Sequence, residues 1–215
     1  MGGSTRFGIL VYDEVEPIDV GATYGVLSMA RRAFPQIEMF LVAERAGAVK
    51  LTNNLTVQAH YGYDDCPPVD IMVVTGGGGW KQQVKNAATL SFLRGLPMST
   101  IVASVCTGGM IVAAAGLLDG KKATTRRCGI SSETTPLELM GKSHSTIEPV
   151  DALIVDNGRV ITGGGVSLAM DTMFYLLARV LGPAVADEVA RLTEYTHARR
   201  ANQSHLKSYI CEPVP

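Results

Sequence analysis

The stretch Ser99–Gly120, STIVASVCTGGMIVAAAGLLDG, decides the fold of this 215-residue chain. It begins with a short apolar run rich in β-branched residues, which is typical of a buried strand. An apolar segment of helical length follows, and Gly120 lies just after its end, as is common at helix C-termini. Cys106 stands between the two segments. The stretch therefore predicts a buried strand and a helix joined by a tight turn that carries a cysteine.

Strands and helices alternate on both sides of this stretch. Short apolar or alternating runs predict further strands at residues 6–13, 37–43, 55–61 and 70–75, and a hairpin at residues 152–165 with its turn at 156–158. Apolar spacing predicts helices at residues 15–34, 90–96, 167–182 and 183–202. This alternation indicates an α/β fold: a single-domain three-layer α/β/α sandwich with a mostly parallel sheet. We expect the domain to cover residues 6–201, after a disordered leader at 1–5 and before a C-terminal tail at 202–215.

The composition excludes several classes of protein. Hydrophobic residues make up 47% and charged residues 18%, which is enough apolar material for a sizeable core. The formal net charge of -1 lacks the basic excess of a nucleic-acid binder. No apolar run is long enough to cross a membrane, and the N-terminal stretch lacks the features of a signal peptide. The four cysteines form no CxxC pair and no metal-type cluster with histidine, so we expect reduced thiols in a cytoplasmic protein without a metal.

The turn at Cys106 is the first candidate for chemistry. Ligands of such folds bind beyond the carboxyl ends of the strands, where this turn would lie. The amide dipoles of a helix N-terminus lower the pKa of a thiol, so we expect a thiolate in a turn that resembles a nucleophile elbow. Gly108 would let a substrate approach the backbone closely. The alternative is that Cys106 is a small buried hydrophobic residue without chemistry.

Two other loops follow strands of the predicted sheet. Thr75–Trp80, TGGGGW, offers several backbone N–H groups and lacks the residues of a P-loop, so Gly77 and Gly78 are candidates for an oxyanion hole. The same glycines could serve only a sharp turn. After the first strand, Asp19 or Glu16 could extend to the same edge of the sheet. Asp19 is either a helix N-cap or a carboxyl group that hydrogen-bonds the cysteine, and the sequence does not separate these interpretations.

Histidine is missing beside the candidate nucleophile. A cysteine protease or amidotransferase needs a histidine to activate its thiol. None of the four histidines in the chain is adjacent to Cys106, and His197 and His205 lie among basic residues near the C-terminus. The sequence therefore favours chemistry that needs a thiolate, a carboxyl group and backbone donors over a Cys–His dyad.

Four segments carry a family resemblance over residues 6–192: SVCTGG, DCPPVDIMVVTGGGG, GLLDGKKATT and ITGGGVSLAMD. They resemble the ThiJ/PfpI superfamily, whose fold is flavodoxin-like and glutamine amidotransferase-like. The match is closest to its isonitrile hydratase-like branch, which also includes sensor domains of AraC-type regulators. The resemblance implies that Cys106 is the nucleophile, that Asp19 hydrogen-bonds it and that Thr107 is the threonine of the hydratases. It also implies that Gly77 and Gly78 form the backbone side of an anion-binding pocket.

The chain departs from this pattern after ATT, where many hydratase-like relatives have His-Trp. Arg126 and Arg127 stand there instead, in a segment that lines or covers the pocket of the family. The two arginines either select an anionic substrate or face solvent. We expect Arg126 to bind substrate.

The resemblance implies a lyase without a cofactor, an isonitrile hydratase-like enzyme that acts on a small-molecule substrate. Two alternatives stay open: a glyoxalase or deglycase acting on reactive aldehydes, and a non-catalytic redox or ligand sensor whose thiol is oxidised. The resemblance also implies a homodimer. Apolar positions on the first helix, Tyr24, Leu27 and Met29, are compatible with a dimer face if they are exposed. We expect neither nucleic acid nor a membrane as a partner.

Overall fold

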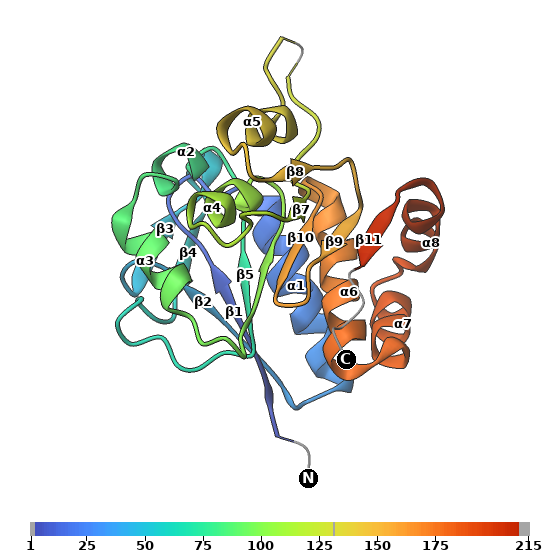
Figure 1. Ribbon diagram of the computed structural model, residues 1–215. Helices are drawn as coiled ribbons and strands as arrows, with labels where there is room; N and C mark the ends of the chain where they lie inside the picture. Colours follow the sequence, from blue (N-terminus) through green and yellow to red (C-terminus); the bar gives the residue numbers. More distant parts are fainter. Residues whose placement is uncertain (1–2, 131, 211–215) are drawn as a thin grey trace.

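A seven-stranded sheet forms the centre of the computed structural model, which describes residues 3–130 and 132–210 (Figure 1). Its order is β11-β9-β10-β6-β5-β1-β2. Neighbouring strands from β2 to β10 pair in parallel, whereas β9 is antiparallel to β10 and β11 is parallel to β9. The strands are β1 (Thr5–Leu10), β2 (Ile37–Val42), β5 (Ile71–Val74), β6 (Ile101–Ser104), β9 (Ile154–Asp156), β10 (Val160–Gly163) and β11 (Ser208–Ile210).

Helices cover both faces of this sheet, as Figure 1 shows. On one face lie α1 (Pro17–Ala33), α6 (Ala169–Leu181) and α7 (Pro183–Leu192), with α8 (Thr196–His205) packed against α7. On the other lie α2 (Trp80–Gln83), α3 (Ala87–Gly95) and α4 (Gly108–Ala114). The predicted three-layer α/β/α sandwich with a mostly parallel sheet is confirmed.

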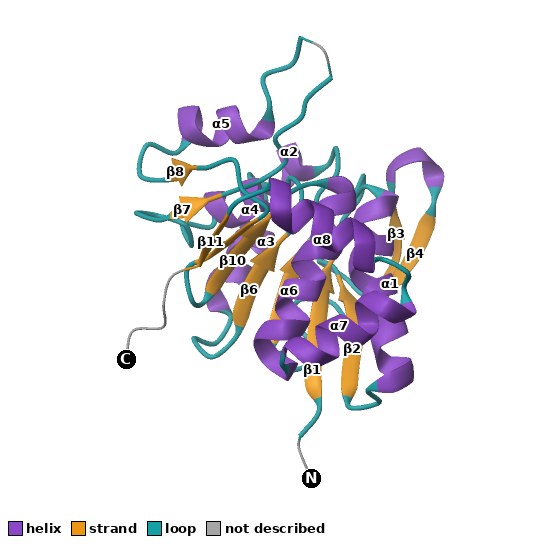
Figure 2. Cartoon of the chain, turned by 90° about the vertical axis from the view of Figure 1, so that its right-hand side faces the viewer, coloured by secondary structure: helices purple, strands orange, loops and turns teal. Residues whose placement is uncertain are grey.

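Shorter elements lie beside the sheet. They are the hairpin β3 (Gly47–Lys50) and β4 (Thr56–Ala59), the pair β7 (Lys122–Ala123) and β8 (Glu148–Pro149), the helix α5 (Pro136–Ser143), and the 3-10 turns η1 (Thr52–Asn54) and η2 (Val166–Leu168). Figure 2 shows α5 above the edge where the parallel strands end. This helix begins with a capping box, in which the Thr135 hydroxyl accepts from the N–H of Glu138.

The two central strands explain why the sequence forms a core here. All four residues of β5 are buried, and β1 is buried from Phe7 to Leu10, because helices lie on both faces of the sheet. Phe174 of α6 is also fully buried. Gly108 allows α4 to approach β5, since a Cβ atom there would overlap the carbonyl group of Val74. Because β1, β5 and β6 are parallel neighbours, their carboxyl ends meet at one edge of the sheet.

The predicted hairpin at residues 152–165 is confirmed as β9 and β10. Its turn is held by the carboxylate of Asp156, which accepts from the N–H of Gly158 at 2.6 Å. Within the described part of the chain, no helix combines the length and the apolarity that crossing a membrane would require. The cysteines described there are free thiols, and Cys211 lies outside the described residues.

The C-terminal region differs from the sequence-based prediction. The single helix expected at residues 183–202 is two helices, because the chain turns at Glu194, whose φ of +54° interrupts helical geometry. Part of the expected tail is ordered into the sheet: β11 pairs with β9, and the N–H of Leu153 donates to the carbonyl of Lys207 at 2.7 Å. At the other end β1 already begins at Thr5, inside the expected leader, of which residues 1 and 2 lie outside the described structure.

The apolar positions offered for a dimer face are also corrected in part. Leu27 is fully buried in the core, because it faces the sheet rather than solvent. Tyr24 and Met29 are half-buried. Leu27 therefore cannot contribute to a dimer face.

Candidate active site

Cys106 occupies the turn between β6 and α4, as predicted. Its φ of +52° lies in the left-handed region, which costs a residue with a Cβ atom conformational energy. Hydrogen bonds to other segments hold this turn: the N–H of Cys106 donates to the carbonyl of Gly164 at 3.0 Å, and its carbonyl accepts from the Thr125 hydroxyl at 2.6 Å. The strained strand–turn–helix geometry is that of a nucleophile elbow.

The sulfur of Cys106 is surrounded by polar groups although the residue is only 2% exposed. The backbone N–H groups of Val166 and Thr107 donate to it, and Asp19 and Arg126 lie close enough to influence its charge. Val166 is β-branched and has a φ of +59°, an unfavourable conformation for such a residue. The sequence analysis missed Val166, for which the three preceding glycines were the only signal.

Asp19 is the carboxyl group paired with this sulfur. It lies in the first turn of α1, whose N-cap is Glu16, so the N-cap interpretation of Asp19 is wrong. Its Oδ2 accepts from the N–H of Gly76 at 2.8 Å, whereas the buried Oδ1 has no nitrogen or oxygen partner among the described residues. Burial raises the pKa of Asp19 to about 7, although the hydrogen bonds from Gly76 and Cys106 and the charge of Arg126 partly oppose this.

The expected lowering of the thiol pKa is wrong. Burial and the neighbouring charge of Asp19 raise the pKa of Cys106 to about 12. The N–H groups of Val166 and Thr107 and the charge of Arg126 act in the opposite direction, but they do not offset the loss of water around the sulfur. Burial therefore favours the protonated thiol, whereas the raised pKa of Asp19 brings its carboxyl group into the range of neutral pH.

The glycine loop after β5 packs directly against the turn. The N–H of Gly77 donates to the Thr107 hydroxyl at 2.9 Å, and this hydroxyl donates to the Gly77 carbonyl at 3.3 Å. Two of the predicted backbone donors are therefore already bonded within the protein. The N–H of Gly77 donates to Thr107, and the N–H of Gly108 donates to the carbonyl of Val105 at 2.9 Å. Gly78 has open space beside it, so its backbone is accessible from the pocket described next.

A pocket of about 350 Å³ lies over this turn. Its lining residues are Gly77, Gly78, Trp80, Lys81, Thr107, Arg126, Gly129, Glu133, Thr134, Pro136 and Leu139. Thr107 brings this pocket to the turn, whereas Cys106 and Asp19 are buried beneath it and are not among its described lining residues. The two adjacent arginines have different surroundings. Arg126 lines the pocket, whereas Arg127 forms an ion pair with Asp151 at 2.8 Å.

Comparison with known proteins identifies the family. The sequence model described as the DJ-1/PfpI family matches residues 5–179, most of the chain. The chain belongs to the DJ-1/PfpI family. An isonitrile hydratase from Pseudomonas putida is 30% identical over 194 residues, which cover 90% of this chain and 79% of the hydratase. The crystal structure of a ThiJ/PfpI family protein from Pseudomonas syringae superimposes with a TM-score of 0.76 at 22% identity, covering 93% of this chain and 84% of that one.

Another protein that this chain resembles is a transcriptional regulator. The HTH-type transcriptional regulator GbdR of Pseudomonas aeruginosa is 26% identical over 157 residues, which cover 73% of this chain but only 40% of the regulator. The resemblance to the ThiJ/PfpI superfamily is thus confirmed. Because the proteins that this chain resembles include both an enzyme and a regulator, family membership alone does not determine the reaction.

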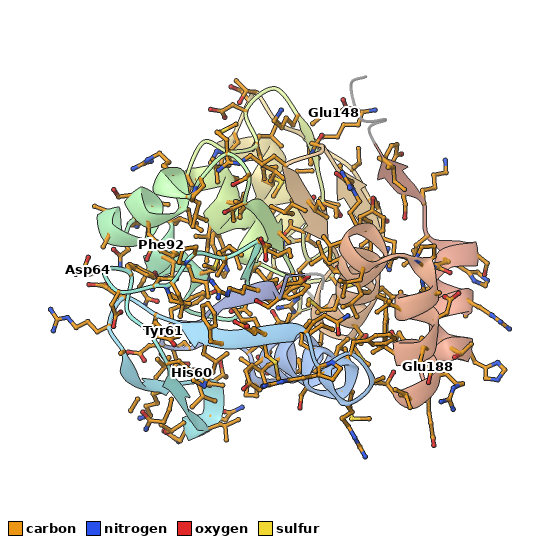
Figure 3. The ribbon with its side chains drawn as sticks, turned by 90° about the horizontal axis from the view of Figure 1, so that it is seen from below. His60, Tyr61, Asp64, Phe92, Glu148 and Glu188 are labelled. Carbon is orange, nitrogen blue, oxygen red and sulfur yellow. The ribbon has the colours of Figure 1, made fainter. Side chains whose placement is uncertain are left out.

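No histidine of this DJ-1/PfpI protein lines the pocket. The ring of His60 accepts from the N–H of Leu41 at 3.0 Å, and Figure 3 shows it beside Tyr61, on the hairpin side of the molecule. Among residues 3–130 and 132–210, no three His, Cys, Asp or Glu side chains are grouped so that they could hold a metal ion.

Gly76 determines how closely this DJ-1/PfpI site is packed. A Cβ atom at Gly76 would lie 2.5 Å from the backbone nitrogen of Thr107 and 2.7 Å from the Cβ of Cys106. We expect Gly76→Ala to lower the free energy of unfolding by about 1–3 kcal/mol, because the loop and the turn must move apart. Gly78→Ala is the matched control, since nothing lies within 4 Å of its added methyl group. Equal denaturation midpoints of the two variants in urea would contradict the prediction.

Proposed function

We propose that this protein is an isonitrile hydratase-like lyase. The observation that carries the proposal is the pairing of a cysteine in a strained turn with a buried carboxyl group, Asp19, whose pKa of about 7 suits proton transfer at neutral pH. A pocket that Thr107 of this turn lines lies beside it, and no histidine lines that pocket. The 30% identity to an isonitrile hydratase supports this choice among the activities open to the family.

In the first half of the reaction the Asp19 carboxylate accepts the proton of the Cys106 thiol as the sulfur attacks the terminal carbon of the isonitrile. A carbon–sulfur bond forms, and negative charge develops on the same carbon. Asp19 then gives its proton to that carbon, and a thioimidate results. The N–H groups of Val166 and Thr107 donate to the sulfur. They stabilise the negative charge on the sulfur after its proton has moved to Asp19.

In the second half Asp19 is again a carboxylate and accepts a proton from water as the water oxygen adds to the thioimidate carbon. The proton passes to the substrate nitrogen, which gives a tetrahedral adduct. Collapse of this adduct forms the carbonyl group, breaks the carbon–sulfur bond and returns the hydroxyl proton to the sulfur through Asp19. The sum is isonitrile plus water to N-substituted formamide, without a cofactor or a metal.

The direct test is incubation of the protein with cyclohexyl isonitrile, followed by quantification of the formamide by NMR. We expect formamide to accumulate over many turnovers. Methylglyoxal is assayed in parallel, because a thiol site of this kind could also attack an aldehyde. Turnover of methylglyoxal without turnover of the isonitrile would contradict the proposal and favour the glyoxalase or deglycase alternative.

The sensor alternative is tested on the same samples. Peroxide treatment followed by mass spectrometry measures oxidation of Cys106. Oxidation in a protein that turns over neither substrate would contradict a catalytic function and favour a sensor. The proposal also includes a homodimer in the cytoplasm, and sedimentation velocity would measure its oligomeric state.

A further inference from the structure

From the side chains around the pocket we infer that its substrate carries a carboxylate group, which Arg126 binds while the reacting carbon lies over Cys106. This inference rests on the proposed function for the reacting group only. The binding of an anion beside Cys106 can be measured without any turnover.

The first argument is that the Arg126 guanidinium forms no ion pair with any of the described residues. It lines the pocket and is half-buried, yet no carboxylate among the described residues lies within 4.0 Å of it. Its neighbour Arg127 is neutralised by Asp151 at 2.8 Å. A guanidinium in a recess has the geometry to bind a carboxylate through two parallel hydrogen bonds. Arg126 is therefore available to a ligand in a way that Arg127 is not.

The second argument is that the backbone of Arg126 is fixed relative to the sulfur. The preceding residue, Thr125, donates from its hydroxyl to the carbonyl of Cys106 at 2.6 Å. The carbonyl of Arg126 accepts from the N–H of Leu137 at 3.2 Å. Gly165 packs so closely that a Cβ atom there would lie 2.9 Å from the Cβ of Arg126. The point from which the Arg126 side chain extends is thus fixed relative to Cys106.

The third argument concerns charge and size. Besides Arg126, the pocket lining includes Lys81 from α2 and a single carboxylate, that of Glu133. Arg126 also lowers the pKa of both Asp19 and Cys106 by its charge, which places it within electrostatic range of the reacting pair. A volume of about 350 Å³ is at the small end of ligand pockets. The site therefore suits a small isonitrile with one carboxylate.

The test compares the alkylation of Cys106 by iodoacetate, an anion, with that by iodoacetamide, its neutral analogue. In both reactions the sulfur forms a bond to the methylene carbon, iodide leaves and the thiol proton is released. Peptide mass spectrometry measures the rate at Cys106 alone. We expect the ratio of the iodoacetate rate to the iodoacetamide rate to fall about tenfold in Arg126→Gln, the equivalent of about 1.4 kcal/mol. Arg127→Gln is the matched control and should leave the ratio unchanged.

An equal ratio in wild type and Arg126→Gln would overturn the inference. Arg126→Lys keeps the charge and should retain part of the preference, whereas a variant that merely loosens the fold would change both rates together. In the activity assay, kcat/KM for an isocyano carboxylate should exceed that for its methyl ester, and Arg126→Gln should remove the difference. If no isonitrile reacts but the alkylation ratio falls in Arg126→Gln, the hydratase proposal is wrong and the inference of an anion site at Arg126 is supported.

Discussion

Cys106→Ala is expected to lower kcat/KM for isonitrile hydration by at least about 10³-fold, because no other group can form the thioimidate. The fold should persist, since the turn is held by backbone bonds to Gly164 and from the Thr125 hydroxyl that do not involve the sulfur. Formamide production measures the first expectation, and far-UV circular dichroism with a thermal melt measures the second.

The matched control is Cys128→Ser. Cys128 is an exposed free thiol two residues from Arg126, so its loss removes a sulfur near the pocket without touching the turn. We expect its kcat/KM to stay within twofold of the wild-type value, since surface substitutions have small effects. Residual activity of Cys106→Ala above a few per cent would rule out the covalent mechanism.

Asp19→Asn is expected to reduce kcat/KM by about 10²–10⁴-fold, the usual contribution of a positioned acid and base. The carboxamide can still accept from the N–H of Gly76, but it cannot exchange a proton with the thiol or with water. Since the wild-type reaction begins from the Asp19 carboxylate, wild-type kcat/KM should rise with pH through about 7, the raised pKa of this carboxyl group. The variant should lack this rise. A wild-type profile that is flat between pH 5.5 and 8.5 would contradict this assignment of Asp19.

The same pKa predicts a change in stability. Between the ordinary pKa of about 4 and the raised one of about 7, the folded protein holds a proton on Asp19 that the unfolded chain has released. The free energy of unfolding should therefore fall as the pH rises through this window, by on the order of 4 kcal/mol. Asp19→Asn should remove this fall and be the more stable protein at pH 8, as urea titrations at pH 5 and pH 8 would measure.

Asp171→Asn controls for the loss of a buried carboxylate elsewhere. Asp171 accepts from the Tyr195 hydroxyl at 3.0 Å and from the Asn202 amide at 2.8 Å, and burial raises its pKa as well. These contacts tie α6 to α8 and do not involve the pocket. We expect this variant to alter stability but to keep kcat/KM within about twofold.

The sequence predicted the sheet well because its central strands are short continuous apolar runs, a pattern that burial on both faces requires. It placed Cys106 correctly because the change from strand to helix is a local signal. Thr107 also lies at the turn, and Asp19 reaches it from the first turn of α1, but the sequence alone left the role of Asp19 undecided. The structure separates its two interpretations because Glu16 is the N-cap and the Asp19 carboxyl contacts Gly76 from a different loop.

Other features depend on contacts that no local pattern encodes. The pKa of Cys106 is raised mainly because the surrounding protein excludes water from the sulfur. Its position at a helix N-terminus alone predicted a lowered pKa. The donor Val166 adopts an unfavourable φ that its residue type argues against. The pairing of β11 with β9 likewise depends on contacts between distant segments, and the break between α7 and α8 depends on a positive φ at Glu194 that the spacing of apolar residues does not encode.

The bond between Thr125 and the carbonyl of Cys106 has a consequence for protein engineering. It anchors the chain to the Cys106 turn one residue before Arg126, and this bond does not involve Pro136 and Leu139 of α5, which line the pocket from another element. Combinatorial libraries at Pro136 and Leu139 should therefore yield variants with altered preferences among small molecules and intact reactivity. The protein is thus a suitable starting scaffold for directed evolution.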